Sequence, residues 1–210
     1  MNSNDTFKLH YFNINGRGAL ARAIFSAAKV PFENHLIEQK DWPAIKQSEL
    51  CEFKQVPVLE HNGKKYSQSG AIYRYLGKLF KLFGNNLEEE YQIDSLLCTI
   101  EDIIPVMTPI IFPNEEQKKH KEEYVKAFKE KLEFYMKVME KRYIALGKGK
   151  YFLGDHFSLA DIFIAVQLVG AQQVLQEDLM KTVAPGLHAI FERVKANELK
   201  EFYEKYILAH

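Results

Sequence analysis

The chain has 210 residues, of which 47% are hydrophobic and 27% charged, and its formal net charge is zero. This composition is typical of a globular protein with one large or two modest domains, and the balanced charge argues against a nucleic-acid partner, which would need a basic face. No apolar run approaches the ~18–20 residues of a membrane helix, and no His, Cys, Asp or Glu cluster has metal-site spacing, so we expect neither a membrane span nor a bound metal.

The first fifty residues predict a strand, a helix and a second strand. Residues 7–12 alternate as a strand does, residues 17–30 carry apolar side chains at helical spacing, and residues 32–37 predict another strand. A strand, a helix and a strand in this order form a βαβ unit with parallel strands. A short helix is then expected from about residue 41 to residue 50.

A hairpin and a capped helix are predicted in the next segment, residues 53–76. Residues 56–59 form an apolar strand, and the pair Asn62-Gly63 is a strong signal for a two-residue hairpin turn. Ser69 precedes a helical pattern, and serine is a favoured N-cap residue, so we expect Ser69 to cap that helix.

Two backbone features of this segment suit a peptide-like ligand that carries a carboxylate. If the Val56–Pro57 bond is cis, Val56 turns its N–H and C=O outward, where they are free to pair with an extended peptide. The helix N-terminus at Ser69 gathers unpaired N–H groups and the positive end of the helix dipole, which attract a carboxylate. Each feature by itself also fits an ordinary hairpin or an ordinary capped helix.

Beyond the break at Gly84-Asn85-Asn86, the sequence predicts helices and no strand. Long helices are expected over residues 88–112 and 115–146, each with an apolar stripe. Ser158 and Asp161 have the spacing of a capping box in front of a helix that is apolar all round and therefore buried. The predicted fold is thus an α/β unit of thioredoxin size followed by a larger all-α domain.

Three segments stand in order along the chain: KLHYFNINGRG, FKQVPVLEHNGKKYSQSGAIYRYL and FLGDHFSLADIFIA. Together they resemble motifs of the cytosolic glutathione transferases of the tyrosine type. The resemblance covers essentially the whole chain and includes features of the sigma, alpha and mu classes, nearest to sigma. It implies a thioredoxin-like domain in residues 1–82, a linker in 83–87 and an all-helical domain in 88–210. The three segments are similar, in turn, to the first strand and loop, the glutathione-binding hairpin and the helix-capping segment of that family.

The resemblance implies that Tyr11 is the catalytic tyrosine and that Arg17 helps to stabilise the glutathione thiolate. A free thiol has a pKa of ~8.5, so little thiolate exists at neutral pH. A hydrogen bond donated to a thiolate is worth about 1.5–3 kcal/mol, which lowers the thiol pKa by roughly one to two units. The implied reaction is attack of this thiolate on a hydrophobic electrophile, a detoxifying conjugation with glutathione as co-substrate.

The resemblance also implies where the two substrates bind. Trp42 and Lys46 would hold the glycine carboxylate of glutathione, the backbone near Val56 would pair with its cysteinyl part, and Asp102 would reach its γ-glutamyl amine from the partner subunit. The implied glutathione-binding residues are Phe12, Trp42, Lys46, Gln55, Val56, Pro57, Gln68, Ser69 and Asp102. The implied electrophile-binding residues are Ile104, Met107, Thr108 and Ile111.

A homodimer is implied as well, since Phe53 stands where alpha- and mu-like members insert an aromatic key into the partner subunit. A phenylalanine at this position could equally belong to the core. The two cysteines, Cys51 and Cys98, do not form a CxxC pair, and the first residues lack the pattern of a secretory signal, so we expect a cytoplasmic protein.

Other functions on the same fold stay open at this point. The chain could be a non-catalytic ligand-binding or structural protein, although such a protein need not keep Tyr11, Gln55 and Ser69. It could also be a glutathione-dependent isomerase or peroxidase of the prostaglandin D synthase type. A thiol-disulfide oxidoreductase is disfavoured, because no cysteine follows the first strand.

Overall fold

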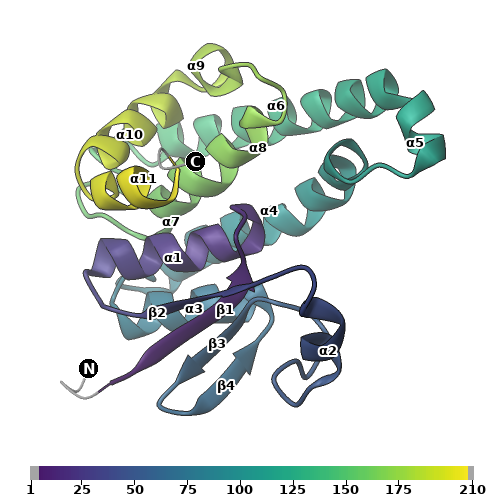
Figure 1. The fold of residues 1–210 in the computed structure, drawn as a ribbon. Helices are drawn as coiled ribbons and strands as arrows, with labels where there is room; N and C mark the ends of the chain where they lie inside the picture. Colours follow the sequence, from purple (N-terminus) through teal and green to yellow (C-terminus); the bar gives the residue numbers. More distant parts are fainter. Residues whose placement is uncertain (1–4, 208–210) are drawn as a thin grey trace. The chain divides into compact units, whose positions relative to one another are not determined.

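The computed structural model describes residues 5–207 of the chain (Figure 1). These residues fall into two compact units: the first comprises residues up to Phe83 together with those from Glu198 onward, and the second is Gly84–Asn197. The chain leaves the first unit at residue 83, inside the predicted linker. At the other end, the predicted second domain ran to residue 210, whereas the structure groups the last helix with the first unit.

A four-stranded mixed sheet forms the centre of the first unit. Its strand order is β2-β1-β3-β4, with β1 and β2 parallel and the other pairs antiparallel, which confirms the predicted βαβ unit and hairpin. The strands are β1 (Phe7–Phe12), β2 (Glu33–Ile37), β3 (Val58–His61) and β4 (Lys64–Ser67). The helices are α1 (Gly16–Ala28), α2 (Trp42–Gln47), α3 (Ser69–Leu79) and α11 (Lys200–Tyr206).

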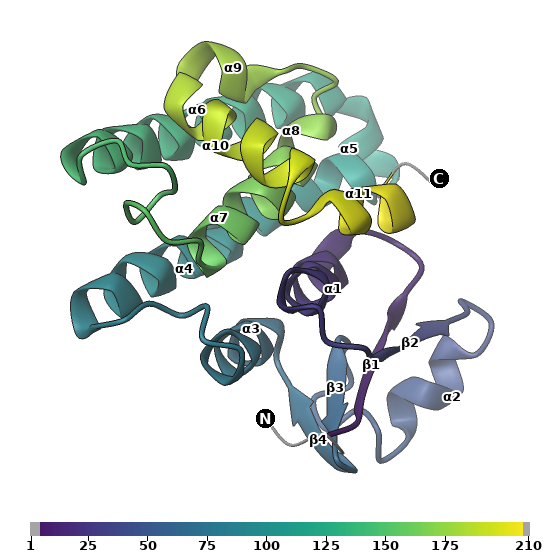
Figure 2. The ribbon, with the colours of Figure 1, turned by 90° about the vertical axis from the view of Figure 1, so that its left-hand side faces the viewer.

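Helices cover both faces of the sheet. Figure 2 shows α1 and α3 on one face and α2 on the other. Successive side chains of a strand point to opposite faces, so Phe7 and Tyr11 of β1 face α1, while Phe12 faces α2. The ring of Phe7 meets the ring of Phe25 on α1 edge to face, with centroids 5.2 Å apart. The end of β1 therefore carries Tyr11 on one side of the sheet and Phe12 on the other.

The turn between β3 and β4 has the conformation that its sequence predicts. Asn62 and Gly63 have φ values of 52° and 78°, and a type I′ turn needs a positive φ at both central residues. The Asn62 side chain also accepts the backbone N–H of Thr6 at 2.8 Å, which ties the turn to the start of β1.

The last helix, α11, joins the first unit because it packs against α1. The ring of Tyr206 lies over the guanidinium of Arg22, with the guanidinium carbon 5.9 Å from the ring centroid. An amphipathic pattern shows that one face of a helix is buried but not which element buries it, so the sequence did not reveal this partner.

The second unit consists of helices joined by loops, with one isolated β-bridge between Tyr151 and Gly154 among its described residues. The long helices α4 and α6 pack side by side, and α7 contacts α4 while α10 contacts α6 (Figure 1). Within the described residues, no helix has both the length and the apolar character needed to cross a membrane. The elements are α4 (Leu87–Ile111), α5 (Glu115–Lys119), α6 (Lys121–Ala145), α7 (Leu159–Phe163), a π-helical turn (Ile164–Leu168), α8 (Val169–Gln173), α9 (Leu179–Val183) and α10 (Pro185–Ala196).

The prediction of one helix over residues 115–146 was wrong, because the chain breaks at His120 into α5 and α6. Asn114 and Gln117 form a capping box that starts the short helix α5. Residues 115–123 carry no apolar side chain, and helices are held mainly by packing of an apolar face, so nothing keeps the two helices continuous. The predicted stripe on α6 is buried at Phe128, Leu132, Met136, Met139 and Tyr143.

The predicted capping box at Ser158 and Asp161 is present. One Asp161 carboxylate oxygen accepts the Ser158 N–H at 2.8 Å, and the other accepts the N–H of Phe152 at 2.7 Å. The helical run that begins here passes through a π-helical turn before α8, and almost all of its residues are buried, as its apolar sequence predicts.

Candidate functional site

Tyr11 presents a buried phenol at the end of β1. Its side chain is only 6% exposed, and its hydroxyl oxygen accepts the backbone N–H of Arg17 at 3.0 Å. A phenol can both accept and donate, so the hydroxyl proton can still be donated to a ligand. Burial raises the pKa of Tyr11, against the opposing effects of the Arg17 N–H and the charges of Arg17 and Arg22. The phenol therefore keeps its proton at neutral pH and is able to donate a hydrogen bond.

Two glycines let the loop after β1 pass close to this phenol. A Cβ at Gly16 would lie 2.6 Å from the Tyr11 hydroxyl oxygen, and a Cβ at Gly18 would lie 2.3 Å from ring carbon Cδ1. Real Cβ atoms do not approach other atoms so closely, so a side chain at either position would displace the ring. The absence of side chains at positions 16 and 18 thus leaves the space that the Tyr11 ring and hydroxyl occupy against this loop.

Arg17 connects this loop to the start of α3. Its Nη1 donates to the Ser69 hydroxyl at 3.2 Å, and its backbone carbonyl accepts the Tyr73 hydroxyl. The loop after β1 and the N-terminus of α3, which are about fifty residues apart in sequence, therefore share one hydrogen-bonded cluster around Tyr11.

We expected Ser69 to be the N-cap of α3, but this prediction was wrong. Ser69 is the first helical residue of α3. The cap position belongs to Gln68, whose side chain makes no capping bond and whose backbone has φ 71° and ψ 111°. The Ser69 hydroxyl accepts from Arg17. A non-glycine residue held at positive φ costs free energy and occurs preferentially where a ligand or an active site requires it.

The bond between Val56 and Pro57 is cis, the condition on which the predicted ligand contact depends. Pro57 is buried and Val56 is half-buried. Within residues 5–207, no hydrogen bond engages the N–H or C=O of Val56. Both groups are thus available to an extended peptide, which would form main-chain hydrogen bonds with them as a neighbouring β-strand does.

Trp42 and Lys46 lie on α2, one helical turn apart, so their side chains share a face. The Trp42 ring meets the ring of Phe12 edge to face at 5.2 Å. Lys46 is exposed, as is Gln55 in the segment before β3. A group of three side chains therefore lies on the α2 side of the sheet: Phe12, Trp42 and Lys46.

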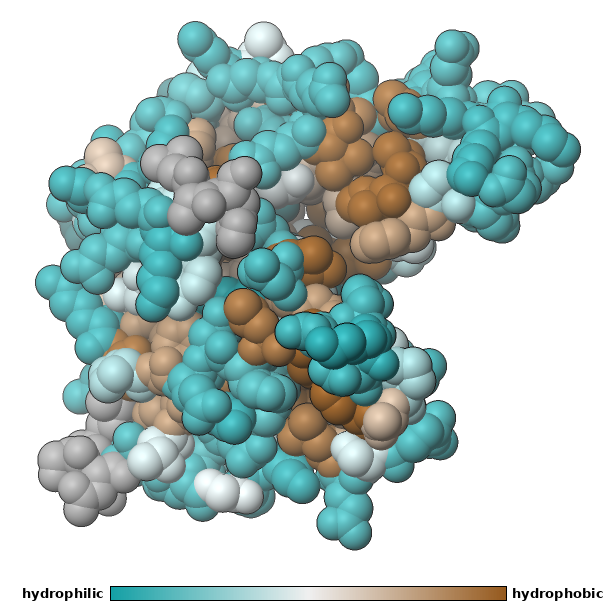
Figure 3. Space-filling view, viewed as in Figure 1, coloured by the Kyte–Doolittle hydropathy of each residue, from teal (hydrophilic) through white to brown (hydrophobic). Residues whose placement is uncertain are grey.

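The remaining predicted residues belong to the second unit. Asp102 is exposed and accepts the Tyr135 hydroxyl at 2.8 Å, and burial together with this carboxylate raises the pKa of Tyr135. Ile104 and Met107 are half-buried on α4, whereas Ile111 is 41% exposed. Figure 3 shows hydrophobic side chains gathered at the surface of this unit over the stretch of α4 and α6 that lies toward α5.

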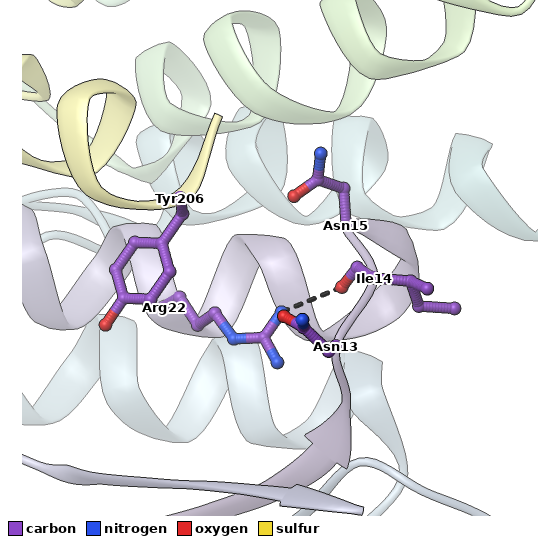
Figure 4. Close-up of a pocket in the computed structure, with 5 residues that line it drawn as sticks. All are labelled: Asn13, Ile14, Asn15, Arg22 and Tyr206. Atoms are coloured by element: carbon purple, nitrogen blue, oxygen red, sulfur yellow. Dashed lines mark hydrogen bonds between the residues drawn. The ribbon is translucent and has the colours of Figure 1, made fainter. Parts of the chain in front are cut away.

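Sequence reasoning missed Arg22, which lies beneath the loop after β1. It is 3% exposed and donates to the backbone carbonyls of Phe12 and Ile14, each at 2.8 Å. Figure 4 shows Arg22 beside Tyr206 in a pocket of about 250 Å³ that is also lined by Asn13, Ile14 and Asn15. The available signal was a charged residue inside the otherwise apolar stretch Ala19–Phe25 of a buried helix.

No three His, Cys, Asp or Glu side chains among residues 5–207 are grouped to hold a metal ion. A mixed sheet of order β2-β1-β3-β4, a cis-proline before β3 and an all-helical second unit define the glutathione transferase class of fold.

Comparison with known proteins gives the same class. Two domain families match the chain: "Glutathione S-transferase, N-terminal domain" over residues 7–78 and "Glutathione S-transferase, C-terminal domain" over residues 101–206. The chain belongs to the glutathione S-transferase family. It is an enzyme of that family, with glutathione as co-substrate and hydrophobic second substrates.

The relatives that match most of this chain include proteins named glutathione S-transferase and proteins named prostaglandin D synthase. Glutathione S-transferase 1 of Ascaris suum is 33% identical over 178 residues, which are 82% of this chain and 84% of that protein. The hematopoietic prostaglandin D synthase of Homo sapiens is 34% identical over 158 residues, 75% of each chain. The solved structure of prostaglandin synthase D of Nilaparvata lugens has a TM-score of 0.82 at 31% identity and covers 95% of this chain and 98% of its own.

Proposed function

We propose that Tyr11 activates glutathione by donating a hydrogen bond from its hydroxyl to the sulfur, which stabilises the thiolate that remains once the thiol proton has left to solvent. This thiolate then attacks hydrophobic electrophiles. One observation carries this proposal. The Tyr11 hydroxyl oxygen accepts a hydrogen bond from the Arg17 N–H, and this bond orients the phenol. The hydroxyl hydrogen of Tyr11 is then still able to form a hydrogen bond to a ligand. A hydrogen bond to a thiolate is charge-assisted, so it stabilises the thiolate more than the thiol and lowers the thiol pKa.

Arg17 supports the same thiolate in this proposal. Its guanidinium is anchored on the Ser69 hydroxyl, and a positive charge near a thiol also favours the thiolate. The electrostatic effect adds to the hydrogen bond from Tyr11, and neither residue forms a covalent bond with substrate.

The proposed orientation of glutathione uses the backbone and side chains of the first unit. The free N–H and C=O of Val56 pair with the cysteinyl part, and Gln68 and Ser69 hold the γ-glutamyl end. Trp42 and Lys46 hold the glycine carboxylate. Phe12 and Gln55 line the same region, Pro57 keeps Val56 turned outward, and Asp102 acts from the partner subunit.

Lys46→Ala is expected to weaken glutathione binding without slowing the chemical step. An exposed charge pair contributes about 0.2–1 kcal/mol, so the dissociation constant should rise about 1.4- to fivefold. Isothermal titration gives the dissociation constant, and kcat is measured at saturating glutathione. Lys40→Ala is the matched control, since Lys40 is an exposed lysine just before α2. Equal affinities for wild type and Lys46→Ala would remove Lys46 from the binding site.

The second substrate, in this proposal, lies against α4 of the helical unit, at Ile104, Met107, Thr108 and Ile111. Support comes from the apolar side chains that remain partly exposed on this stretch. The domain division would then be functional, with residues 1–82 binding glutathione and the helices after residue 87 binding the electrophile. Detoxification is the corresponding biological role.

A glutathione-dependent isomerase is a second candidate, because a relative 34% identical to this chain is named hematopoietic prostaglandin D synthase. A panel of a chloronitrobenzene, an isothiocyanate, an organic peroxide and a prostaglandin endoperoxide, each with glutathione, separates the activities. Conjugation of the aromatic electrophile above the uncatalysed rate is the expected result. Turnover of the endoperoxide alone would make the isomerase the better description, and turnover of none would favour a binding protein.

We further propose a two-fold homodimer in which Phe53 enters a pocket of the partner subunit. Phe53 is 54% exposed, an unfavourable state for a large apolar side chain in a monomer. Phe53→Ser should therefore shift the dimer toward monomer in sedimentation at micromolar concentration. Leu36→Ser, which changes another exposed apolar residue of the same unit, is the control. A dimer of unchanged strength would exclude the key role of Phe53.

A cytoplasmic location is part of the proposal. Neither the buried Cys51 nor the exposed Cys98 forms a disulfide within residues 5–207, as is usual in a reducing compartment. Cell fractionation with an antibody to the protein should recover it in the cytosolic fraction, and recovery in the secreted fraction would contradict this.

A further inference from the structure

We propose that Arg22 is a positioning residue for the reaction, whose buried guanidinium holds the loop after β1 and faces the Tyr11 ring so that the phenol stays oriented as a donor. This inference rests on the proposed role of Tyr11. Arg22 would touch neither glutathione nor the electrophile, and would act only through Tyr11 and the loop.

The first argument is the placement of the three donor nitrogens of Arg22. Nη2 donates to the carbonyl of Phe12 and Nη1 to the carbonyl of Ile14, each at 2.8 Å, while Nε donates to Oδ1 of Asn34 at 3.0 Å. The two carbonyls lie in the segment that leads from Tyr11 to the Arg17 N–H. Arg22 therefore fixes both the residue after the phenol and the loop that brings the N–H to it.

The second argument is the charge of Arg22. Its guanidinium carbon lies 5.6 Å from the centroid of the Tyr11 ring, within the range of a cation–π contact. No Asp or Glu in residues 5–207 forms an ion pair with Arg22, and the side chain is 3% exposed. Burial lowers the pKa of Arg22, yet an arginine remains charged at neutral pH.

A buried cation without a carboxylate is costly, because its desolvation is not offset by a counter-charge. Here the charge meets the faces of two aromatic rings, that of Tyr11 and that of Tyr206. Figure 4 shows Arg22 beside Tyr206. A nearby positive charge favours the phenolate of Tyr11 and so makes its O–H a stronger donor. The effect should reach the thiolate through the Tyr11 hydrogen bond.

The test replaces Arg22 in the full-length enzyme and titrates bound glutathione by its thiolate absorbance. Arg22→Gln should raise the pKa of the bound thiol by about 0.5–1 unit, a three- to tenfold loss of thiolate below that pKa. The dissociation constant of glutathione should change less than about twofold. Arg22→Lys keeps the charge but not the three-way geometry, so it should restore part of the shift. Arg193→Gln, in the second unit, is the matched control.

The Tyr11→Phe background separates the possible outcomes. In that background Arg22→Gln should cause no further change in the thiol pKa, because the effect passes through the hydroxyl. If Arg22→Gln is folded and the thiol pKa stays at the wild-type value, this inference is wrong while the role of Tyr11 stands. If Tyr11→Phe itself leaves the thiol pKa unchanged, the proposed function is wrong. Should Arg22→Gln fail to fold, Arg22→Lys decides, since a wild-type thiol pKa in that variant would show that the geometry is not needed.

Discussion

Tyr11→Phe is expected to slow glutathione conjugation about 8- to 25-fold at pH 7, the loss of thiolate that follows when the pKa of the bound thiol rises from about 6.5–7.5 to ~8.5. The change removes only the hydroxyl oxygen, so the ring should keep its place against Gly16 and Gly18. The loss therefore reports on the hydrogen bond to sulfur and not on the packing of β1. The measurement is kcat/KM with a chloronitrobenzene at saturating glutathione.

The pH profile of the rate gives this prediction a second readout. At high pH the bound thiol ionises without help from Tyr11, so Tyr11→Phe should approach wild-type activity as the pH rises above ~8.5. Tyr91→Phe, which removes the hydroxyl of an exposed tyrosine on α4, is the matched control and should retain full activity. A Tyr11→Phe enzyme as fast as wild type at pH 7 would refute the catalytic assignment.

Asp161→Ala is expected to lower the free energy of unfolding by about 3–4 kcal/mol, a large part of the 5–15 kcal/mol of a typical domain. The Asp161 carboxylate is fully buried and accepts the N–H groups of Phe152 and Ser158. Both donors lie on buried residues, so removal of the carboxylate leaves two N–H groups without an acceptor or water. Urea unfolding followed by circular dichroism measures the change.

The same carboxylate predicts a pH dependence of stability. Burial raises the pKa of Asp161 to about 6, against the lowering effect of its hydrogen bonds. The folded state then binds more protons than the unfolded state between pH ~4 and ~6, so stability is highest below this window and falls as the pH rises through it. A shift of about two units corresponds to roughly 2–3 kcal/mol. Asp161→Asn should lose this pH dependence while remaining less stable than wild type at pH 4.

Asp155→Ala controls for both measurements, because Asp155 lies in the same loop and is exposed. Its unfolding free energy should differ from wild type by less than about 0.5 kcal/mol. An Asp161→Ala protein as stable as Asp155→Ala would mean that water satisfies the two N–H groups and that the capping box is unimportant for the fold.

Local signals predicted the parts of the fold that local chemistry determines. The turn at Asn62-Gly63 requires residues that tolerate positive φ, and the sequence supplies them at the expected positions. The capping box of Ser158 and Asp161 needs only a three-residue spacing. In both cases the interacting groups are near neighbours in the chain, so sequence pattern was sufficient.

The errors arose where distant contacts decide. Ser69 looked like an N-cap because serine favours that position, but its hydroxyl instead accepts from Arg17, about fifty residues away. The break at His120 was missed because the residues on both sides favour helix, and only the lack of an apolar face permits the break. Local propensity cannot show either effect.

In the candidate site, too, local signals were predicted from the sequence and contacts between distant residues were not. Tyr11 was found through the resemblance of its motif, and Val56 through the local geometry of the Val56–Pro57 bond together with that resemblance; both signals are continuous in sequence. Arg22 was not found, because its acceptors are backbone carbonyls eight and ten residues away, and a backbone acceptor has no residue type to recognise. The placement of α11 against α1 was unpredictable for the same reason.

Titration of the bound thiol tests the central claim most directly, since the claim concerns one hydrogen bond and one ionisation. Thiolate absorbance of glutathione bound to the wild-type enzyme is recorded against pH, and again with Tyr11→Phe. The account predicts a thiol pKa of about 6.5–7.5 in wild type and a return toward ~8.5 in the variant. Equal pKa values in the two proteins, with glutathione bound to both, would contradict it.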